Sequence, residues 1–359
     1  MSLSYLQCLK KQKRRRMLKK LKSNRIPLLF IILSVIGYIV SGMSLNFVMS
    51  EVVTRILRNS VMVLSLIVPI IAGLGLNFAI SIGALAAQTA ILFVLNYGLE
   101  GYPALLAVVL LSTILAVAFG YVIGAILNRV KGREMITSII IGYIGISIYQ
   151  LIFMVGFGTI IPATNEKLLL KSGLGIQHVV NLESLGGIID DCLKFEIWGI
   201  KCSVLNLVII TVVSLFIFYL LRSKLGINMK AVGESMDKSQ SLGIDVNKMR
   251  IIAIIISTVL AAYGQIMYLQ NVGMLSVYTA QSNREIFSSA AILAGGAGIK
   301  NANIRNVFLG LFLFHFLFIV SPLAGQTLFS SVAIGEYFRT FISYAVICLA
   351  IIFNVKENI

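Results

Sequence analysis

Few residues of this chain could carry out covalent chemistry. The 359 residues include two histidines and four cysteines, and no paired carboxylates, HExxH motif or Ser/His/Asp set points to an enzyme. A Gly-x-x-x-x-Gly-Lys-Ser/Thr phosphate loop does not occur, so ATP hydrolysis is not expected on this chain. The cysteines form no CxxC pair. We therefore assign no catalytic residue, no metal site and no cofactor.

Neutral polar side chains inside long apolar stretches are the best candidates for binding a ligand. Amides and hydroxyls can hydrogen-bond to an uncharged polar molecule such as a sugar, a nucleoside or a flavin. Ser81 and Gln88 are seven residues apart and would share one face of a helix. We expect a path for such a molecule to be lined by Asn77, Ser81, Gln88, Gln265 and Gln270.

One histidine and two cysteines allow more than one interpretation. His315 lies among Leu, Phe and Ile, and a neutral histidine bonded to a neighbouring helix is favoured over a proton relay, because the apolar stretches offer no Asp or Glu as relay partners. Cys192 and Cys202 fall in one segment expected outside the membrane. They could form a disulfide or remain two free thiols.

Transmembrane helices must position these residues. The chain is 58% hydrophobic and 12% charged, with a mean hydropathy of +0.95, whereas a soluble domain is about 25% charged. A helix needs about 20 apolar residues to cross a bilayer. The sequence predicts an all-α polytopic membrane protein with about ten spans, at residues 26–49, two within 61–95, 103–127, 135–155, 202–221, 251–269, 285–299, 307–320 and 337–353.

The apolar run 61–95 is too long for one span. A polar turn with Glu51, Arg55 and Arg58 is expected before it, and glycines and polar residues interrupt it between Gly73 and Ser81. Irregular backbone at membrane depth persists only where it is buried in protein or lines a cavity, and broken helices often mark a transport site. We predict a broken helix here.

The predicted span 251–269 carries a face of small residues, Ser257, Ala261 and Gly264. Such a face is suited to close packing against another helix.

The positive charge predicts how the chain is oriented. Of the net charge of +16, ten Lys/Arg lie between Lys10 and Arg25 with no acid among them. Basic residues before a span favour the cytoplasmic side and bind anionic lipid. Binding to nucleic acid is not expected, since no aromatic residues are interleaved for stacking. Most other Lys/Arg fall in loops of the same side, so both termini are expected in the cytoplasm.

These patterns divide the chain into a basic cytoplasmic tail, 1–25, a transmembrane domain, 26–353, and a short cytoplasmic tail, 354–359. Within the domain, 156–201 is expected outside, with an amphipathic surface helix near 179–189. Residues 222–250 form a cytoplasmic stretch with six Lys/Arg and three acidic residues. There we predict a helix starting at Asn228, an interruption at Gly233, and a second short helix ending at Gly243, with both glycines allowing sharp turns.

Three motifs resemble those of one transporter family. The cytoplasmic stretch contains Lys230-Ala231-Val232-Gly233-Glu234 and Leu242-Gly243-Ile244-Asp245-Val246, followed by Lys248 and Arg250. This resembles the coupling loop of ABC importer permeases of the branched-chain amino acid, ribose and nucleoside permease family. Ser235 stands where that family has Asn, and Ser239 and Ser241 replace an alanine pair. The broken segment from Gly73 to Gly83 and the run from Ala290 to Gly296 are similar to two further family motifs, so the resemblance extends over about 61–353.

The resemblance implies a fold like that of type II-like ABC importer permeases in a bacterial inner membrane. Two permease subunits, identical or related, would form the pathway, two ATPase subunits would dock beneath them, and an extracytoplasmic binding protein would deliver the solute. The residues it implies for ATPase coupling are Ala231, Gly233, Glu234, Ser239, Leu242 and Gly243. An ATP-independent secondary carrier or channel is the alternative.

Overall fold

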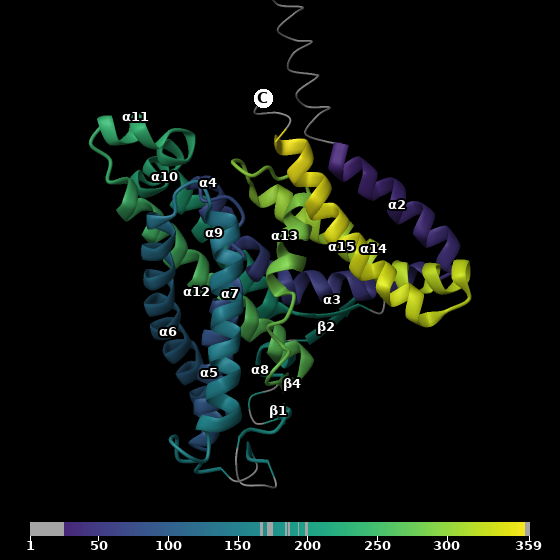
Figure 1. Cartoon of the computed structure of the whole chain (residues 1–359). Coiled ribbons are helices and arrows are strands. Elements are labelled where there is room, and N and C mark those ends of the chain that lie inside the picture. The colour runs from purple at the N-terminus through teal and green to yellow at the C-terminus, as the bar shows by residue number, and fades with distance from the viewer. Residues whose placement is uncertain are drawn as a thin grey trace, which may run out of the picture.

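The computed structural model describes residues 25–165, 168–170, 175–183, 185, 187–192, 194–197 and 200–355. The predicted basic tail lies almost wholly outside these residues, and so does the end of the C-terminal tail. Most described elements are helices, as predicted from composition. Figure 1 shows helices α10 (Lys224–Glu234) and α11 (Met236–Ser241) at one end of the molecule and strands β1 (Val179–Asn181) and β4 (Met274–Ser276) toward the other.

The helices of the transmembrane domain are α2 (Arg25–Ser41), α3 (Leu45–Leu64), α4 (Ile67–Ile71), α5 (Ile80–Asn96), α6 (Gly101–Arg129), α7 (Glu134–Leu151) with a π-helical turn (Ile152–Gly156), α8 (Ile188–Asp191), α9 (Val204–Arg222), α10 (Lys224–Glu234), α11 (Met236–Ser241), α12 (Val246–Val272), α13 (Arg284–Ala294), α14 (Ile304–Phe329) and α15 (Val332–Val355). Two short antiparallel sheets join β1 (Val179–Asn181) to β4 (Met274–Ser276) and β2 (Lys194–Ile197) to β3 (Ile200–Ser203).

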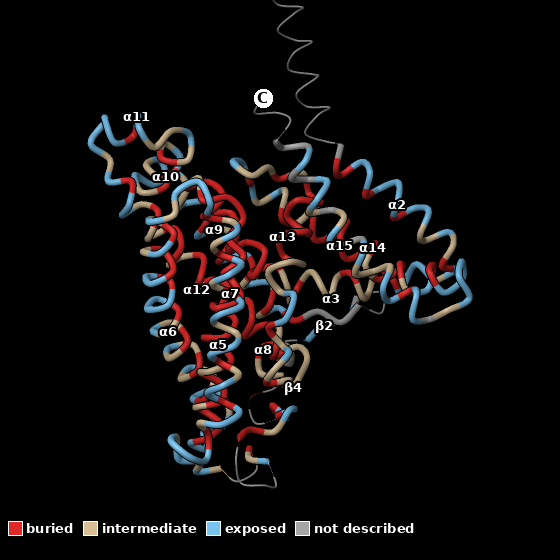
Figure 2. The backbone as a smooth tube through the Cα atoms, viewed as in Figure 1, coloured by how far each residue is buried: buried red, intermediate tan, exposed pale blue. Residues whose placement is uncertain are grey.

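Two helices form the centre of the molecule. Helix α12 packs against α3, α5 and α6, while α14 packs against α2, α3, α13 and α15. In the most apolar windows of α12 and α14, 61% of the residues are buried, against 22–28% in α6, α7 and α9. Figure 2 shows the same contrast between a buried α12 and the exposed outer side of α6. Because the exposed residues of the outer helices are apolar, lipid is their natural solvent.

The small-residue face of α12 packs closely, as predicted. A Cβ at Gly264 would lie 2.6 Å from the backbone nitrogen of Met62 in α3. On α5, a Cβ at Gly83 would lie 2.5 Å from the carbonyl oxygen of Thr258 and 2.8 Å from the Cβ of Ala261. Small residues therefore allow the three helix backbones to approach one another.

The first span and the polar turn after it were wrongly predicted. Helix α2 ends at Ser41, because Gly42 adopts a positive φ of 62°. The charged residues that suggested a turn instead lie within α3, where Arg55 and Glu51 form an i,i+4 ion pair at 3.6 Å. Their charges mark one polar side of a helix rather than its end.

The outer segment and the eighth span also differ from the prediction. Residues 179–181 form a strand paired with β4. Among the described residues of the amphipathic region, the only helix, α8, has four residues. Helix α13 has eleven residues, about 16 Å in length, which is too short to cross a bilayer core of about 30 Å. Cys192 is a free thiol and takes part in no disulfide, while the side chain of Cys202 lies outside the described residues.

Five helices of the described residues are long and apolar enough to span a membrane: α6, α7 with its π turn, α9, α12 and α14. Helices α2 and α5 are apolar but shorter. The polytopic membrane fold is thus confirmed, while a count of ten spans is not.

Candidate functional site

Side-chain caps shape residues 222–250 into two short helices, α10 and α11, and the start of a third, α12. Ser223, Ser235 and Asp245 each accept a hydrogen bond from the backbone N–H three residues later, at the start of α10, α11 and α12. Helix α10 therefore begins at Lys224 rather than at the predicted Asn228. The second short helix is confirmed, and it is followed by Gly243 with a φ of 78°.

Gly233 brings α10 into direct contact with the broken helix. It does not interrupt α10, which continues to Glu234. A Cβ at Gly233 would lie 2.1 Å from the carbonyl oxygen of Ile71, and one at Gly73 would lie 2.7 Å from the Cα of Gly233. Two backbones meet here with no room for a side chain. The glycine is needed for this close approach, and not for the sharp turn that the sequence suggested.

The predicted break lies between α4 and α5. Helix α4 ends at Ile71 and α5 begins at Ile80, and Gly73 and Gly75 within this interval have φ values of 78° and 72°. Only glycine adopts such values at low cost. The position predicted from the sequence is confirmed.

Side chains of two other helices hold the broken segment. Asn77 accepts a hydrogen bond from the backbone N–H of Ala79 at 3.1 Å and donates to Ser257 of α12 at 3.3 Å. The backbone N–H of Phe78 donates to Ser138 of α7 at 3.2 Å. Movement of the break would consequently be transmitted to α7 and α12.

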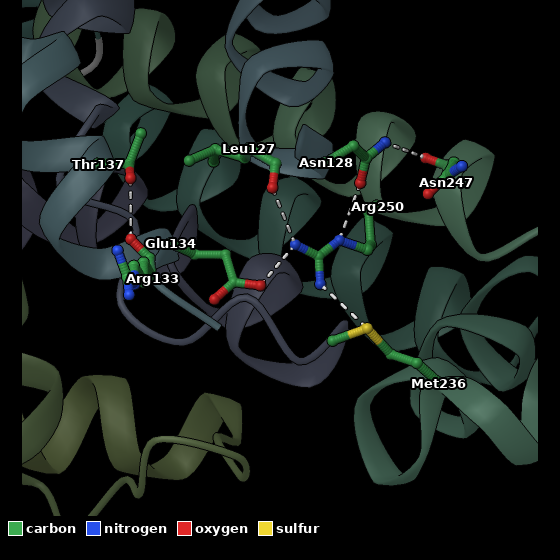
Figure 3. A network of polar contacts seen from close by, with 8 residues as sticks. All are labelled: Leu127, Asn128, Arg133, Glu134, Thr137, Met236, Asn247 and Arg250. Atoms are coloured by element: carbon green, nitrogen blue, oxygen red, sulfur yellow. Dashed lines mark hydrogen bonds and ion pairs between the residues drawn. The ribbon is translucent and has the colours of Figure 1, made fainter. Parts of the chain in front are cut away.

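A buried ion pair braces the same end of the molecule (Figure 3). Arg250, at the start of α12, is fully buried, and its Nη2 lies 2.6 Å from Oε1 of Glu134. Its Nε donates to Asn128 at 2.9 Å and its Nη2 to the carbonyl of Leu127 at 3.3 Å. Nη1 lies 3.4 Å from the sulfur of Met236 in α11. One guanidinium thus joins α6, α7, α11 and α12.

The sequence alone did not predict this brace. Arg250 was noted only at the end of the polar stretch 222–250, and Glu134 was not singled out. Both residues lie near the start of a helix on the expected cytoplasmic side, and this shared position was the only hint in the sequence. It did not indicate that the two residues are paired.

The six predicted coupling residues divide into two groups. Glu234, Leu242 and Gly243 are exposed, with Leu242 showing 78% of its surface. Ser239 is buried and donates to the carbonyl of Ser235 at 2.8 Å. Ala231 is half-buried, as is Gly233, which packs on the break. The exposed three are accessible at the surface, and the others pack against neighbouring residues.

The five predicted pathway residues are all buried in helix contacts. Of the five, Ser81 alone lines a described cavity, which lies beside α7, α13 and α15. Its hydroxyl donates to the carbonyl of Phe78 at 3.3 Å. Gln88 is fully buried, and within the described part of the chain neither polar atom of its amide has a hydrogen-bond partner.

Two of the predicted pathway amides also bond to loops near β1 and β4. Gln265 donates to the carbonyl of Ala280 at 3.3 Å, and Gln270 donates to that of Leu185 at 2.6 Å. Nearby, the hydroxyl of Tyr278 donates to the carbonyl of Ile176 at 3.0 Å. Burial raises the pKa of Tyr278, so its hydroxyl keeps the proton that it donates.

His315 meets the expectation of a bond to a neighbouring helix. Its Nε2 lies 3.4 Å from the side-chain nitrogen of Asn59 in α3, and the residue is buried.

The chain was compared with known proteins. A family model described as "Branched-chain amino acid transport system / permease component" matches residues 28–352. The chain belongs to this permease family. No curated protein and no solved structure matches it. As a member, the chain is a membrane permease subunit of an ABC transporter, a class that works with ATPase and substrate-binding partners.

Proposed function

We propose that this chain is the permease subunit of an ABC importer, which forms the pathway for a small polar solute such as a sugar or a nucleoside. A separate ATPase subunit supplies the energy and docks on α10 and α11. A second permease subunit, identical or related, completes the pathway, and an extracytoplasmic binding protein delivers the solute. The protein lies in the bacterial inner membrane with both termini in the cytoplasm.

The observation that carries this proposal is the contact between Gly233 and the break at Gly73. A force applied to α10 by a closing ATPase reaches the broken helix through backbone atoms alone, without a flexible side chain between them. Packed elements transmit such displacements because they switch between discrete arrangements rather than deform. The Arg250 brace keeps α11 and α12 aligned while α10 pushes.

A bulky residue at position 233 tests the coupling. Gly233→Leu should uncouple the importer, so that substrate-stimulated ATPase activity and uptake are both lost. Gly156→Leu is the matched control, because a Cβ there meets only Ile152, at an ordinary 3.8 Å. Normal uptake by Gly233→Leu would contradict the proposal.

A second variant guards against simple misfolding. Glu234 is exposed, so Glu234→Trp should leave the fold intact while obstructing the docking surface. We expect the ATPase subunit to co-purify with the wild type and not with this variant. An ATP-independent carrier would instead transport its solute with no ATPase bound.

A further inference from the structure

A second cavity, of about 320 Å³, lies between α3, the end of α12, the turn that follows β4, α13 and α14. Three arginines line it: Arg55 and Arg58 from α3 and Arg284 from the first turn of α13. Tyr268 and His315 complete the polar wall. These five residues define what is called here the arginine cavity. Neither the predicted pathway nor the coupling stretch includes any of them.

The positive charges of the arginine cavity are largely uncompensated. Arg58 donates to the neutral Asn271 at 3.4 Å, and Arg284 donates to Asn59 at 3.2 Å and to the carbonyl of Ala280 at 3.1 Å. Among the described residues, no carboxylate lies within ion-pair distance of Arg58 or Arg284.

Arg55 is the exception, since it has Glu51 at 3.6 Å. Glu285, which follows Arg284 in the sequence, lines the other cavity.

Aromatic rings take the place of counter-ions. The guanidinium carbon of Arg284 lies 3.1 Å from the ring centre of Tyr268, and that of Arg58 lies 5.3 Å from the same ring. A cation–π contact offsets only part of the cost of removing a guanidinium from water. The Nε of Arg58 is buried and, among the described residues, has no hydrogen-bond partner. This guanidinium therefore has hydrogen-bonding capacity that the described residues leave unused.

The surroundings strengthen attraction for an anion. Phe287, Phe314 and Phe318 form an apolar wall, and charges interact more strongly beside apolar groups than in open water. The N-terminus of α13 adds a partial positive charge, and its first residue is Arg284. Guanidinium groups match the planar geometry of carboxylate and phosphate oxygens and bind them with paired hydrogen bonds.

We propose that the arginine cavity binds an oxyanion, the carboxylate or phosphate group of the transported solute. This deepens the proposed function by adding an acidic group to the sugar-like or nucleoside-like solute, and it depends on that function only for the identity of the ligand. The cavity adjoins β4, away from α10 and α11 (Figure 1). With the coupling helices in the cytoplasm, a solute delivered from outside meets these arginines first.

Phosphate binding to the purified full-length protein tests the site. The protein is placed in nanodiscs of phosphatidylcholine, and its thermal unfolding is followed as inorganic phosphate replaces chloride at constant ionic strength. The unfolding temperature of the wild type should rise with phosphate. Arg58→Gln should weaken the apparent affinity about tenfold or more, as expected for a lost charge-assisted hydrogen bond. Arg305→Gln removes an exposed charge elsewhere and should bind like the wild type.

A lipid headgroup carries the same phosphate chemistry, so the lipid is varied as well. If phosphatidylglycerol in the nanodiscs stabilises the wild type and abolishes the response to free phosphate, the occupant is a lipid and the proposal is wrong. An equal phosphate response in both lipids supports a soluble ligand. The absence of a response in the wild type, or an undiminished one in Arg58→Gln, would overturn the site.

A second substitution separates misfolding of Arg58→Gln from the loss of phosphate binding. Arg58→Lys keeps the positive charge and should retain part of the rise in unfolding temperature with phosphate. If Arg58 had only a structural role, keeping its charge would not preserve this phosphate response. None of these measurements involves an ATPase, so the site can fail while the importer function stands, and the reverse also holds.

Discussion

Breaking the ion pair between Arg250 and Glu134 should be among the most destabilising single changes in this chain. Glu134→Gln preserves the shape of the side chain and removes its charge, which leaves a fully buried guanidinium without an anion. At 2.6 Å, the gross attraction is about 6 kcal/mol for an effective dielectric constant of about 20. Neutral contacts to Asn128 and Leu127 remain. Removing one partner of a buried pair typically costs about 3–5 kcal/mol, and we expect a loss of that size.

The assay is reversible unfolding in mixed micelles, with the free energy of unfolding measured for each variant. Glu336→Gln is the control, because its partner Arg339 and Glu336 itself are 30% and 49% exposed, and such a pair contributes about 0–1 kcal/mol. The double variant Glu134→Met with Arg250→Met removes both charges and should recover most of the stability. If Glu134→Gln unfolds with the same free energy as the wild type, or if the double variant is less stable than either single one, the assigned role of the pair is refuted.

Three further predictions follow from packing and exposure. Gly264→Leu should destabilise the protein by more than about 3 kcal/mol, since the Met62 backbone leaves no space and α12 would be forced from α3; unfolding measurements check this. Gln88→Leu should raise the free energy of unfolding by about 1 kcal/mol, because an apolar group replaces a buried amide that has no partner. The same variant should lower solute uptake, because Gln88 is predicted to line the pathway. Unchanged uptake would remove Gln88 from the pathway. Cys192, a half-buried free thiol, should react with a membrane-impermeant maleimide added outside intact cells, and reaction only after lysis would reverse the proposed orientation.

Close backbone approach could not be predicted from residue types alone. Gly233 was recognised from a motif, but its role was assigned to a turn, because a glycine in a polar stretch looks the same whether it turns the chain or touches another backbone. The contact with Ile71 joins residues far apart in the sequence. The charged residues of α3 were misassigned for a similar reason. Their charges indicated polar surroundings, and only the fold showed that these surroundings are a cavity inside the protein.

Composition and charge by themselves determined that this chain is a helical membrane protein. They did so because so apolar a chain, with so little charge, needs lipid around it. The glycines at Gly73 and Gly75 marked the position of the helix break, because they adopt positive φ at low cost. Tertiary structure decided which polar residues face one another. It bonded the predicted pathway amides Gln265 and Gln270 to loop carbonyls, paired Arg250 with Glu134, and gathered three arginines around one cavity. Such pairings depend on distances between helices, and those are set by the packing of the whole core.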